Sequence, residues 1–291
     1  MRKRLLACAA LTLLHMMLVA LVIVTAPAGE VIAYSAPGEV TQDIFIQDLS
    51  RGIVRNVTSA FGSHHETSPA WSPDRWHIAF SAPPDTYALS DIYVIALDGS
   101  GLRQLTTFAG NDFHPAWSPD GRQIAYASYI GGGTADIYII DSDGSNLRQL
   151  TATTPYEYEP TWSPDGLLIA FHTLDKGRES IRLVDAADGN ERVLVDGSYS
   201  SPVWSPDGVR IASLSSSGQI VVIDVEDGRV QTLDIAGTQT ALTWLPDSSQ
   251  IAYLSTRCDC DPEVYVFDTE HGRERRLGLQ RAWGDVPVWR P

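Results

Sequence analysis

The sequence is poor in cysteine and in basic residues, and both shortages narrow the class of protein. Only three cysteines occur among 291 residues, too few for a disulfide scaffold or a cysteine-rich zinc fold. Lysine and arginine total 21 against 36 aspartate and glutamate residues, which gives a net charge of −15. A nucleic-acid binder needs a basic face to neutralise phosphates, so nucleic acid is excluded as a partner. Hydrophobic residues make up 44% of the chain, enough for a core held by packing alone.

Recognisable catalytic motifs are also missing. The chain contains no Gly-x-Ser-x-Gly, so the nucleophile of an α/β-hydrolase has no signal in the sequence. The run Gly131-Gly132-Gly133 has no lysine and no helical pattern after it, which predicts a loop and not a phosphate-binding site. Cys258 and Cys260 have no histidine nearby in sequence; in an oxidising compartment they would form a strained disulfide or stay as free thiols. No catalytic residue is predicted.

Long hydrophobic runs are confined to the N-terminus. Three basic residues within the first four positions precede an almost wholly apolar stretch over residues 5–26. This order predicts export, with the basic end kept in the cytoplasm. The small residues Ala26-Pro27-Ala28 fit a signal-peptidase site, whereas the length of the stretch also fits a membrane span. We therefore expect residues 1–28 to be a signal peptide or an N-terminal membrane anchor, and residues 29–291 to lie in the periplasm or at the cell surface.

Six internal repeats dominate the rest of the chain. A tryptophan followed by a turn sequence recurs every 40 to 46 residues, at Trp71, Trp117, Trp162, Trp204, Trp244 and Trp289. An Ile-Ala pair also recurs six times, beginning at Ile32, Ile78, Ile124, Ile169, Ile211 and Ile251. A period of this length with several short apolar runs is typical of four-stranded propeller blades. Paired-helix solenoids are excluded, because no unit carries an amphipathic helical stripe.

One unit shows how the residues specify a blade. Pro115–Trp117 reads as a first strand, and the Ser-Pro-Asp-Gly that follows has the residues that a type I turn prefers. Ile124–Ser128 is apolar throughout, as expected of a strand buried on both faces. Asp136–Asp141 and Leu147–Thr151 complete the unit as third and outer strands. Four antiparallel strands are therefore predicted for each repeat.

The two repeating signals are out of phase at the chain ends. The strand at Ile32–Ser35 has no tryptophan strand before it, and the strand at Pro287–Trp289 has no Ile-Ala strand after it. Pairing these two strands completes one blade from both ends of the chain and removes the exposed sheet edges. The sequence therefore predicts an all-β, six-bladed propeller of four-stranded antiparallel blades, closed by sharing of N- and C-terminal strands.

The repeated motifs P-x-W-S-P-D-G, I-A-[YF], D-I-Y and L-R-Q-L-T resemble the propeller repeats of the TolB family. The resemblance covers essentially all of the chain after the export segment. It implies an exported propeller that binds a protein or peptide at the cell envelope, although related blades also occur in prolyl-oligopeptidase-like enzymes. Arg75 and Ser248 depart from the pattern, since they replace the turn glycine of the other repeats.

The two faces of the predicted ring differ in regularity. The scaffold face carries the turns between strands one and two and between strands three and four, whose near-identical sequences are explained by turn geometry. We name the opposite side the variable face; it consists of the loops 82–90, 129–135 and 256–262 and the blade connections 59–68, 107–114, 152–159, 196–201, 235–241 and 279–286. Variable loops on a rigid ring are the expected place for recognition.

Acidic residues gather where these connections enter the innermost strands. The predicted binding residues at this channel rim are Glu66, Asp112, His114, Glu157, Glu159, Tyr199 and Asp285. Such a rim suits a basic peptide segment, a sugar or a hard cation such as calcium, and solvated surface carboxylates are the competing interpretation. The favoured hypothesis is a monomeric, non-enzymatic module, without a resident cofactor or metal, that binds a protein or peptide in the cell envelope.

A metal-dependent enzyme is the alternative hypothesis. His64 or His65, His114 and His172 come from three consecutive blades near the variable face, and Glu157 or Glu159 lies close to them in the repeat. Imidazoles and a carboxylate could hold a transition metal that activates water, as a lyase or hydrolase acting on a sugar or peptide requires. No local ligand spacing supports this site.

Overall fold

The computed structural model describes residues 31–37, 42–48, 51–61, 65–85, 88–107, 110–130, 133–152, 156–256, 263–276 and 288–289. These ranges contain strands and turns, and no helix in them has the length and hydrophobicity to cross a membrane. The predicted export segment 1–28, the cysteine pair, Asp285 and most of the glycine run lie outside the described residues.

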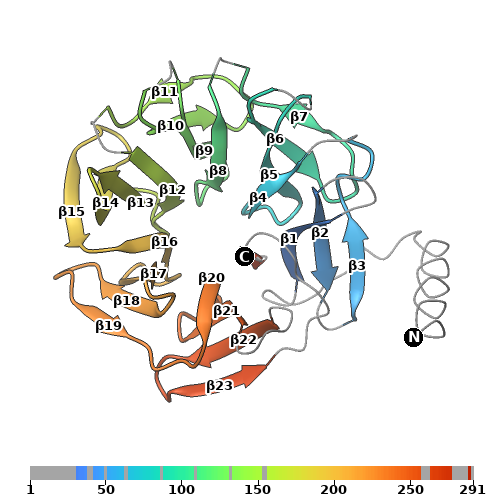
Figure 1. The fold of residues 1–291 in the computed structure, drawn as a ribbon. Coiled ribbons are helices and arrows are strands. Elements are labelled where there is room, and N and C mark those ends of the chain that lie inside the picture. Colours follow the sequence, from blue (N-terminus) through green and yellow to red (C-terminus); the bar gives the residue numbers. More distant parts are fainter. Residues whose placement is uncertain are drawn as a thin grey trace.

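Six antiparallel sheets of four strands each form a closed ring, with one strand of every sheet lining the centre (Figure 1). From the innermost strand outwards, blade 1 consists of β24 (Val288–Trp289), β1 (Val31–Pro37), β2 (Gln42–Asp48) and β3 (Ile53–Asn56). Blade 2 consists of β4 (Thr67–Trp71), β5 (His77–Ala82), β6 (Asp91–Ala96) and β7 (Arg103–Gln104). Blade 3 consists of β8 (Asp112–Trp117), β9 (Gln123–Ser128), β10 (Asp136–Asp141) and β11 (Arg148–Gln149).

The remaining three blades follow in chain order around the ring. Blade 4 consists of β12 (Tyr156–Trp162), β13 (Leu168–Asp175), β14 (Arg178–Asp185) and β15 (Glu191–Asp196). Blade 5 consists of β16 (Tyr199–Trp204), β17 (Arg210–Ser215), β18 (Ile220–Asp224) and β19 (Val230–Thr232). Blade 6 consists of β20 (Thr238–Trp244), β21 (Gln250–Thr256), β22 (Glu263–Asp268) and β23 (Arg273–Arg276). The predicted fold class is confirmed.

The predicted closure of the ring is confirmed as well. Strand β24 pairs antiparallel with β1, so that Ile32 lies opposite Trp289 and Ala33 opposite Val288. The last strand of the chain is thereby the innermost strand of the first blade. No strand edge faces the centre of this blade, because its inner position is filled from the far end of the sequence.

The tryptophans of blades 4, 5 and 6 tie each of these blades to the one before it. Trp162 donates its indole N–H to the backbone carbonyl of Ala116 at 3.1 Å, and Trp204 donates to Thr161 at 3.2 Å. Trp162 also packs with Ala125 and Ile137 of blade 3, in a core shared by two blades. Burial of the large ring between blades explains why tryptophan recurs at this position.

The turn after each tryptophan is closed by its own side chains. In blade 3, Ser118 donates to Asp120 at 2.7 Å and accepts from the backbone N–H of Gln123 at 2.9 Å. Asp120 accepts from the backbone N–H of Arg122 at 3.0 Å, and Gly121 adopts a φ of 72°. The repeated Ser-Pro-Asp-Gly sequence is therefore accounted for by the turn itself.

Candidate functional site

A bulge interrupts the innermost strand of blades 2 to 5 at the same place. In each of these blades, the residue before the proline that recurs in the repeats has a φ between 52° and 55°. These residues are Ser68, His114, Glu159 and Ser201. The strand register shifts across each of them, as it does in blade 6 between Gln239 and Ala241. Left-handed backbone costs an L-residue roughly 1 kcal/mol or more, so four equivalent instances mark a built-in feature of the blades.

Two of these bulge residues join blades 4 and 5. Glu159 accepts the backbone N–H of Ser201 at 2.6 Å and the Ser201 hydroxyl at 3.1 Å. Both residues are half-buried. Among the described residues no cation lies within ion-pair distance of Glu159, so its negative charge is uncompensated there.

Four aromatic rings gather across the junction of blades 3 and 4, and we name them the aromatic cluster: Phe113, Tyr129, Tyr156 and Tyr158. The hydroxyls of Tyr129 and Tyr158 lie 2.7 Å apart. The rings of Tyr156 and Tyr158 are parallel, with centroids 6.2 Å apart, and Phe113 lies 5.4 Å from Tyr129. His114 packs edge-on against Phe113, and His172 lies 6.0 Å from the Tyr158 ring. Since Tyr156 is 39% exposed, the cluster reaches the surface.

Three of the predicted rim carboxylates occupy a different environment from the one expected. Glu66 and Glu157 are 0% exposed and Asp112 is 2% exposed, so the interpretation of these three as solvated rim groups is wrong. All three lie at the start of an inner strand and donate a backbone N–H to a carbonyl of the preceding blade: Glu66 to Gln42, Asp112 to Ser90 and Glu157 to Ala135. Their carboxylates are therefore enclosed between blades, because the strand bulge turns them away from the centre.

Each buried carboxylate belongs to a repeated group that we name a seam triad, made up with an aspartate and a threonine at equivalent positions of the preceding blade. The side chains interact with one another in Asp43, Thr58 and Glu66 and in Asp91, Thr106 and Asp112; at the third junction Thr151 donates to Glu157, and Asp136 stands at the position equivalent to Asp43 and Asp91. In every triad the threonine hydroxyl also accepts a backbone N–H of the third strand at 2.9 Å, from Ile44, Ile92 or Ile137. The repetition at three successive blade junctions indicates a structural role.

Pairing of two carboxylates in a buried seam raises their affinity for protons. Burial, followed by the charge of Asp43, raises the pKa of Glu66 to about 8. Burial, followed by the charge of Asp112, raises the pKa of Asp91 to about 6, and burial raises the pKa of Asp112 as well. One aspartate of each triad accepts from a neighbouring amide: Asn56 donates to Asp43 at 2.6 Å and Gln104 to Asp91 at 2.8 Å. Protonation of one carboxyl group in such a pair relieves the repulsion that two ionised groups would have.

The other predicted site residues are placed as follows. His114 and Glu159 are half-buried bulge residues, and Tyr199 is a half-buried residue at the start of β16 that packs on the core of blades 4 and 5. Their role in binding stays a prediction. The sequence interpretation missed Ser201 and three members of the aromatic cluster, Phe113, Tyr129 and Tyr156. For Phe113 the signal was its departure from Thr67, Ser200 and Thr240 at the corresponding places in other blades.

Of the histidines in the alternative metal hypothesis, His65, His114 and His172 belong to the described residues and His64 lies outside them. In the described part of the chain, no three histidine, cysteine or acidic side chains lie together as a metal site would require. His172 is 9% exposed, and burial lowers its pKa against the opposing influence of Glu159 and Glu179. This imidazole is therefore neutral at pH 7.

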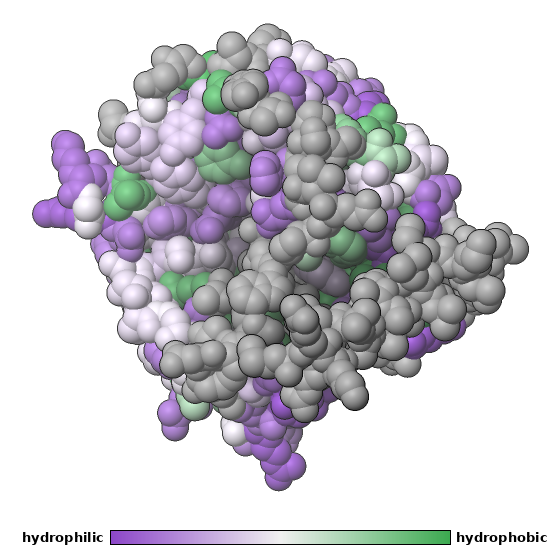
Figure 2. Space-filling view, turned by 45° about the vertical axis from the view of Figure 1, so that its right-hand side comes forward, coloured by the Kyte–Doolittle hydropathy of each residue, from purple (hydrophilic) through white to green (hydrophobic). Residues whose placement is uncertain are grey.

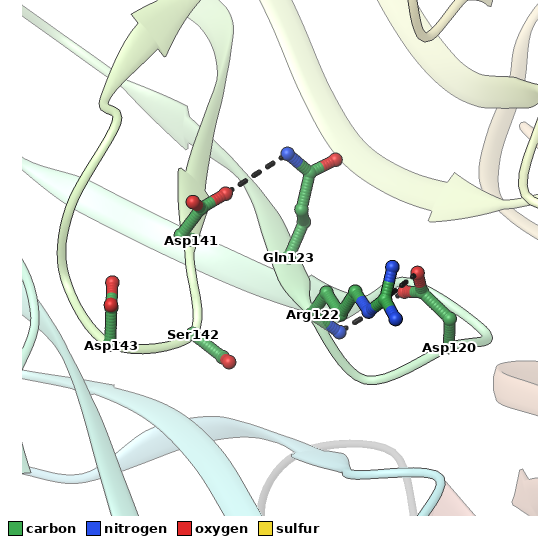
Figure 3. Close-up of a pocket in the computed structure, with 6 residues that line it drawn as sticks. All are labelled: Asp120, Arg122, Gln123, Asp141, Ser142 and Asp143. Atoms are coloured by element: carbon green, nitrogen blue, oxygen red, sulfur yellow. Dashed lines mark hydrogen bonds and ion pairs between the residues drawn. The ribbon is translucent and has the colours of Figure 1, made fainter.

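The scaffold face has a hollow of its own. It measures about 460 Å³ and is lined by Asp120, Arg122, Gln123, Asp141, Ser142 and Asp143 (Figure 3). Gln123 donates to Asp141 at 3.0 Å, and Ser142 donates its backbone N–H to Arg122 at 2.7 Å. These contacts hold the two turns of blade 3 together. The lining residues are thus explained by turn structure.

Comparison with known protein families identifies the repeats. A family model described as the TolB beta propeller domain matches residues 15–211. Among solved structures, TolB from Acinetobacter baumannii superposes with a TM-score of 0.77 at 23% identity, over 91% of this chain and 68% of that one. A puromycin hydrolase superposes with a TM-score of 0.67 at 21% identity, over 88% of this chain and 44% of that one. At these identities the structural matches show a shared fold.

A curated relative is similar over a shorter stretch. The Uncharacterized peptidase YuxL of Bacillus subtilis (strain 168) is 31% identical over 93 residues, which are 32% of this chain and 14% of that protein. The match thus spans about one seventh of that relative's length. The peptidase name describes a larger protein of which only part is similar to these blades.

Proposed function

The chain belongs to the TolB β-propeller family, and we propose that it is an exported, non-enzymatic module whose variable face binds a protein or peptide partner at the cell envelope. The observation that carries the proposal is the contrast between the two faces. Turns on the scaffold face repeat the same internally bonded sequence, whereas the aromatic cluster and the Glu159–Ser201 contact occur at single places on the opposite side. Irregular side chains on a rigid ring are suited to recognition.

Surface chemistry supports a protein or peptide as the ligand. Among the residues that Figure 2 colours, most are hydrophilic or neutral, and the hydrophobic ones form small separate groups. Such a surface matches recognition by a few anchoring side chains within a polar surround. The apolar N-terminal stretch supports export, and the module would act as a monomer beside the membrane.

Site-specific photo-crosslinking in the source organism tests the proposal. A photoreactive amino acid would replace Tyr156 or Leu89 near the variable face, and Asp143 or Glu226 in scaffold-face turns. We expect one discrete cross-linked partner from the first two positions and none from the second two. A partner captured from Asp143 and Glu226 but not from Tyr156 would contradict the proposal, because it would place the binding surface on the repeated turns.

Export and enzyme chemistry have separate tests. Protease added to intact spheroplasts should digest the propeller, and complete protection would contradict export.

The alternative metal-dependent enzyme requires a stoichiometric metal, and elemental analysis of the purified protein would detect manganese, iron or zinc that is lost in a His114→Ala variant. We expect no such stoichiometric metal.

A further inference from the structure

The repeats provide an internal comparison for the junction of blades 3 and 4. Phe113 and Tyr158 stand four residues before their tryptophans, where the other blades have Thr67, Ser200, Thr240 and Asp285. Tyr129 follows the second strand, where other blades have Pro83, Leu174, Ser216 and Thr256. His172 occupies a place held elsewhere by Ser35, Ser81, Ala127, Leu214 and Leu254. The blade fold therefore forms without aromatic residues at these positions, and their concentration at one junction needs another explanation.

The geometry of the aromatic cluster leaves ring surface available to a ligand. The hydroxyl contact between Tyr129 and Tyr158 fixes two rings from neighbouring blades. Tyr156 stacks parallel to Tyr158 and is 39% exposed, and Ile130 beside the cluster is also 39% exposed. Rings held by packing and a hydrogen bond lose little entropy when a ligand binds.

The charged residue next to the cluster in β12 is acidic. Glu159 follows Tyr158 directly in β12, and no described cation is paired with it. His172 beside Tyr158 is neutral at pH 7 because of its burial. Lys176 and Arg178 on the nearby hairpin are exposed, and the cation–π contact found in the described residues is Arg210 over Trp244, in blades 5 and 6. The chain's own described cations do not cover the cluster.

We infer that the aromatic cluster is a subsite for a basic side chain, arginine or lysine, of the bound partner, with Glu159 as its counter-charge. Tyrosine faces attract cations through the ring quadrupole. The charge of Glu159 acts on His172, whose ring lies 6.0 Å from that of Tyr158, and the same charge adds Coulombic attraction for a cation bound there. The net charge of −15 favours approach of the same class of ligand. The inference rests on the proposed recognition function and names the chemistry of one part of the partner.

Short peptides test the subsite without the partner. The probes are blocked Gly-Arg-Gly and Gly-Lys-Gly, with Gly-citrulline-Gly as the uncharged control of matched shape, titrated into the purified full-length protein and followed by ligand-observed NMR. We expect the arginine probe to bind at least about fivefold more tightly than the citrulline probe. Equal binding of the two probes, or stronger binding of neutral N-acetylglucosamine, would overturn the inference.

Substitutions in the aromatic cluster and at Glu159 test whether the arginine probe binds there. Tyr156→Ala and Glu159→Gln should each weaken the arginine probe about fivefold or more, while Tyr158→Phe, which keeps the ring, should retain it. Leu89→Ala is the matched control, because Leu89 is 55% exposed and lies near the same face in blade 2. Thermal melts of all variants check the fold. Unchanged arginine binding in Tyr156→Ala would assign the probe to another place and overturn the inference.

The two proposals fail in different ways. If a partner cross-links at Tyr156 but the arginine probe does not bind, the subsite is wrong and the recognition function stands. If the arginine probe binds and depends on Tyr156 and Glu159, but no partner cross-links from the variable face, the subsite stands and the recognition function fails.

Discussion

Arg75 and Ser248 show how single residues tolerate the backbone of a glycine turn. Both have positive φ, 65° and 59°, at the position where Gly121 has 72°. Arg75 is exposed, whereas the hydroxyl of Ser248 accepts the backbone N–H of Asp207 at 3.0 Å and so links the turns of blades 5 and 6. The strain of the left-handed backbone is therefore offset by a hydrogen bond at Ser248, whereas the side chain of Arg75 is exposed.

Glycine substitution should separate these two cases. Arg75→Gly removes left-handed strain and should raise stability by about 0.5 kcal/mol, after allowance for the flexibility of glycine in the unfolded chain. Ser248→Gly also removes strain but loses the hydrogen bond to Asp207, so no gain is expected. Denaturant melts measure both. A larger gain for Ser248→Gly than for Arg75→Gly would show that the hydroxyl contact does not stabilise the fold.

Glu66 should make the stability of the propeller depend on pH. Its pKa rises to about 8 in the fold from an ordinary value of 4.5, so the folded chain keeps a proton that the unfolded chain releases between these values. Stability is thus fully present below pH 4.5 and is lost as the pH rises through 8, by at most about 1.4 kcal/mol per pH unit. Thermal melts between pH 6.5 and 8.5 should show a falling midpoint.

The window from pH 6.5 to 8.5 brackets the pKa of Glu66. Asp91 has its pKa at about 6, and the lowered pKa of His172 acts with opposite sign only below its ordinary 6.5. Glu66→Gln mimics the protonated acid and should flatten the pH dependence while raising the midpoint at pH 8.5. Glu226→Gln, at an exposed turn, is the control that should leave the slope intact. A slope that persists in Glu66→Gln would exclude Glu66 as its main cause.

Among the elements, the inner strands show what the sequence could and could not predict. Trp71 and Glu66 are five residues apart and both contact blade 1, although strict alternation would put them on opposite faces of the strand. The bulge at Ser68 changes the alternation between them. The repeat length and the turns were predictable because each recurs as a local sequence pattern, and the shared blade followed from the mismatch of the two repeated motifs at the chain ends. The bulge has no such signal beyond the proline that follows it.

The seam triads carried a sequence signal of a different kind. Glu66, Asp112 and Glu157 stand at one constant offset before their tryptophans, and the third-strand aspartates and outer-strand threonines repeat with them. A residue that repeats with the scaffold is expected to serve the scaffold, whereas a site differs between blades. By that criterion the aromatic cluster is the stronger candidate for binding, since it occurs at one junction.

Strand β24 should be essential for stability although it is short. Deleting residues 285–291 leaves blade 1 without its inner strand and exposes the edge of β1. We expect the melting midpoint to fall by roughly 10 °C. Deleting only residues 290–291 keeps the pairs with Ile32 and Ala33 and should change the midpoint little. Equal effects of the two deletions would show that strand sharing does not hold the ring closed.

At the scale of the whole molecule, the propeller carries an excess of negative charge. The net charge of −15 attracts cations over roughly 10 Å at 0.1 M salt, the distance over which screening acts. Burial withdraws Glu66, Asp112 and Glu157 from this surface field, and the raised pKa of Glu66 leaves it largely uncharged at neutral pH. Among the predicted rim residues that the structure describes, Glu159 is therefore the carboxylate available to steer a ligand toward the aromatic cluster.

Association with the partner should then depend on salt and on Glu159 in a defined way. Raising the salt from 0.05 to 0.5 M should slow association by about tenfold, since steering acts on the encounter rate, while dissociation changes less. Glu159→Gln should lower the association rate and weaken its salt dependence. Asp143→Asn removes the same charge from a scaffold-face turn and is the matched control, with little expected change. Surface plasmon resonance with the cross-linked partner measures both rates. If the two variants slow association equally, the overall charge attracts the partner and no particular face directs it.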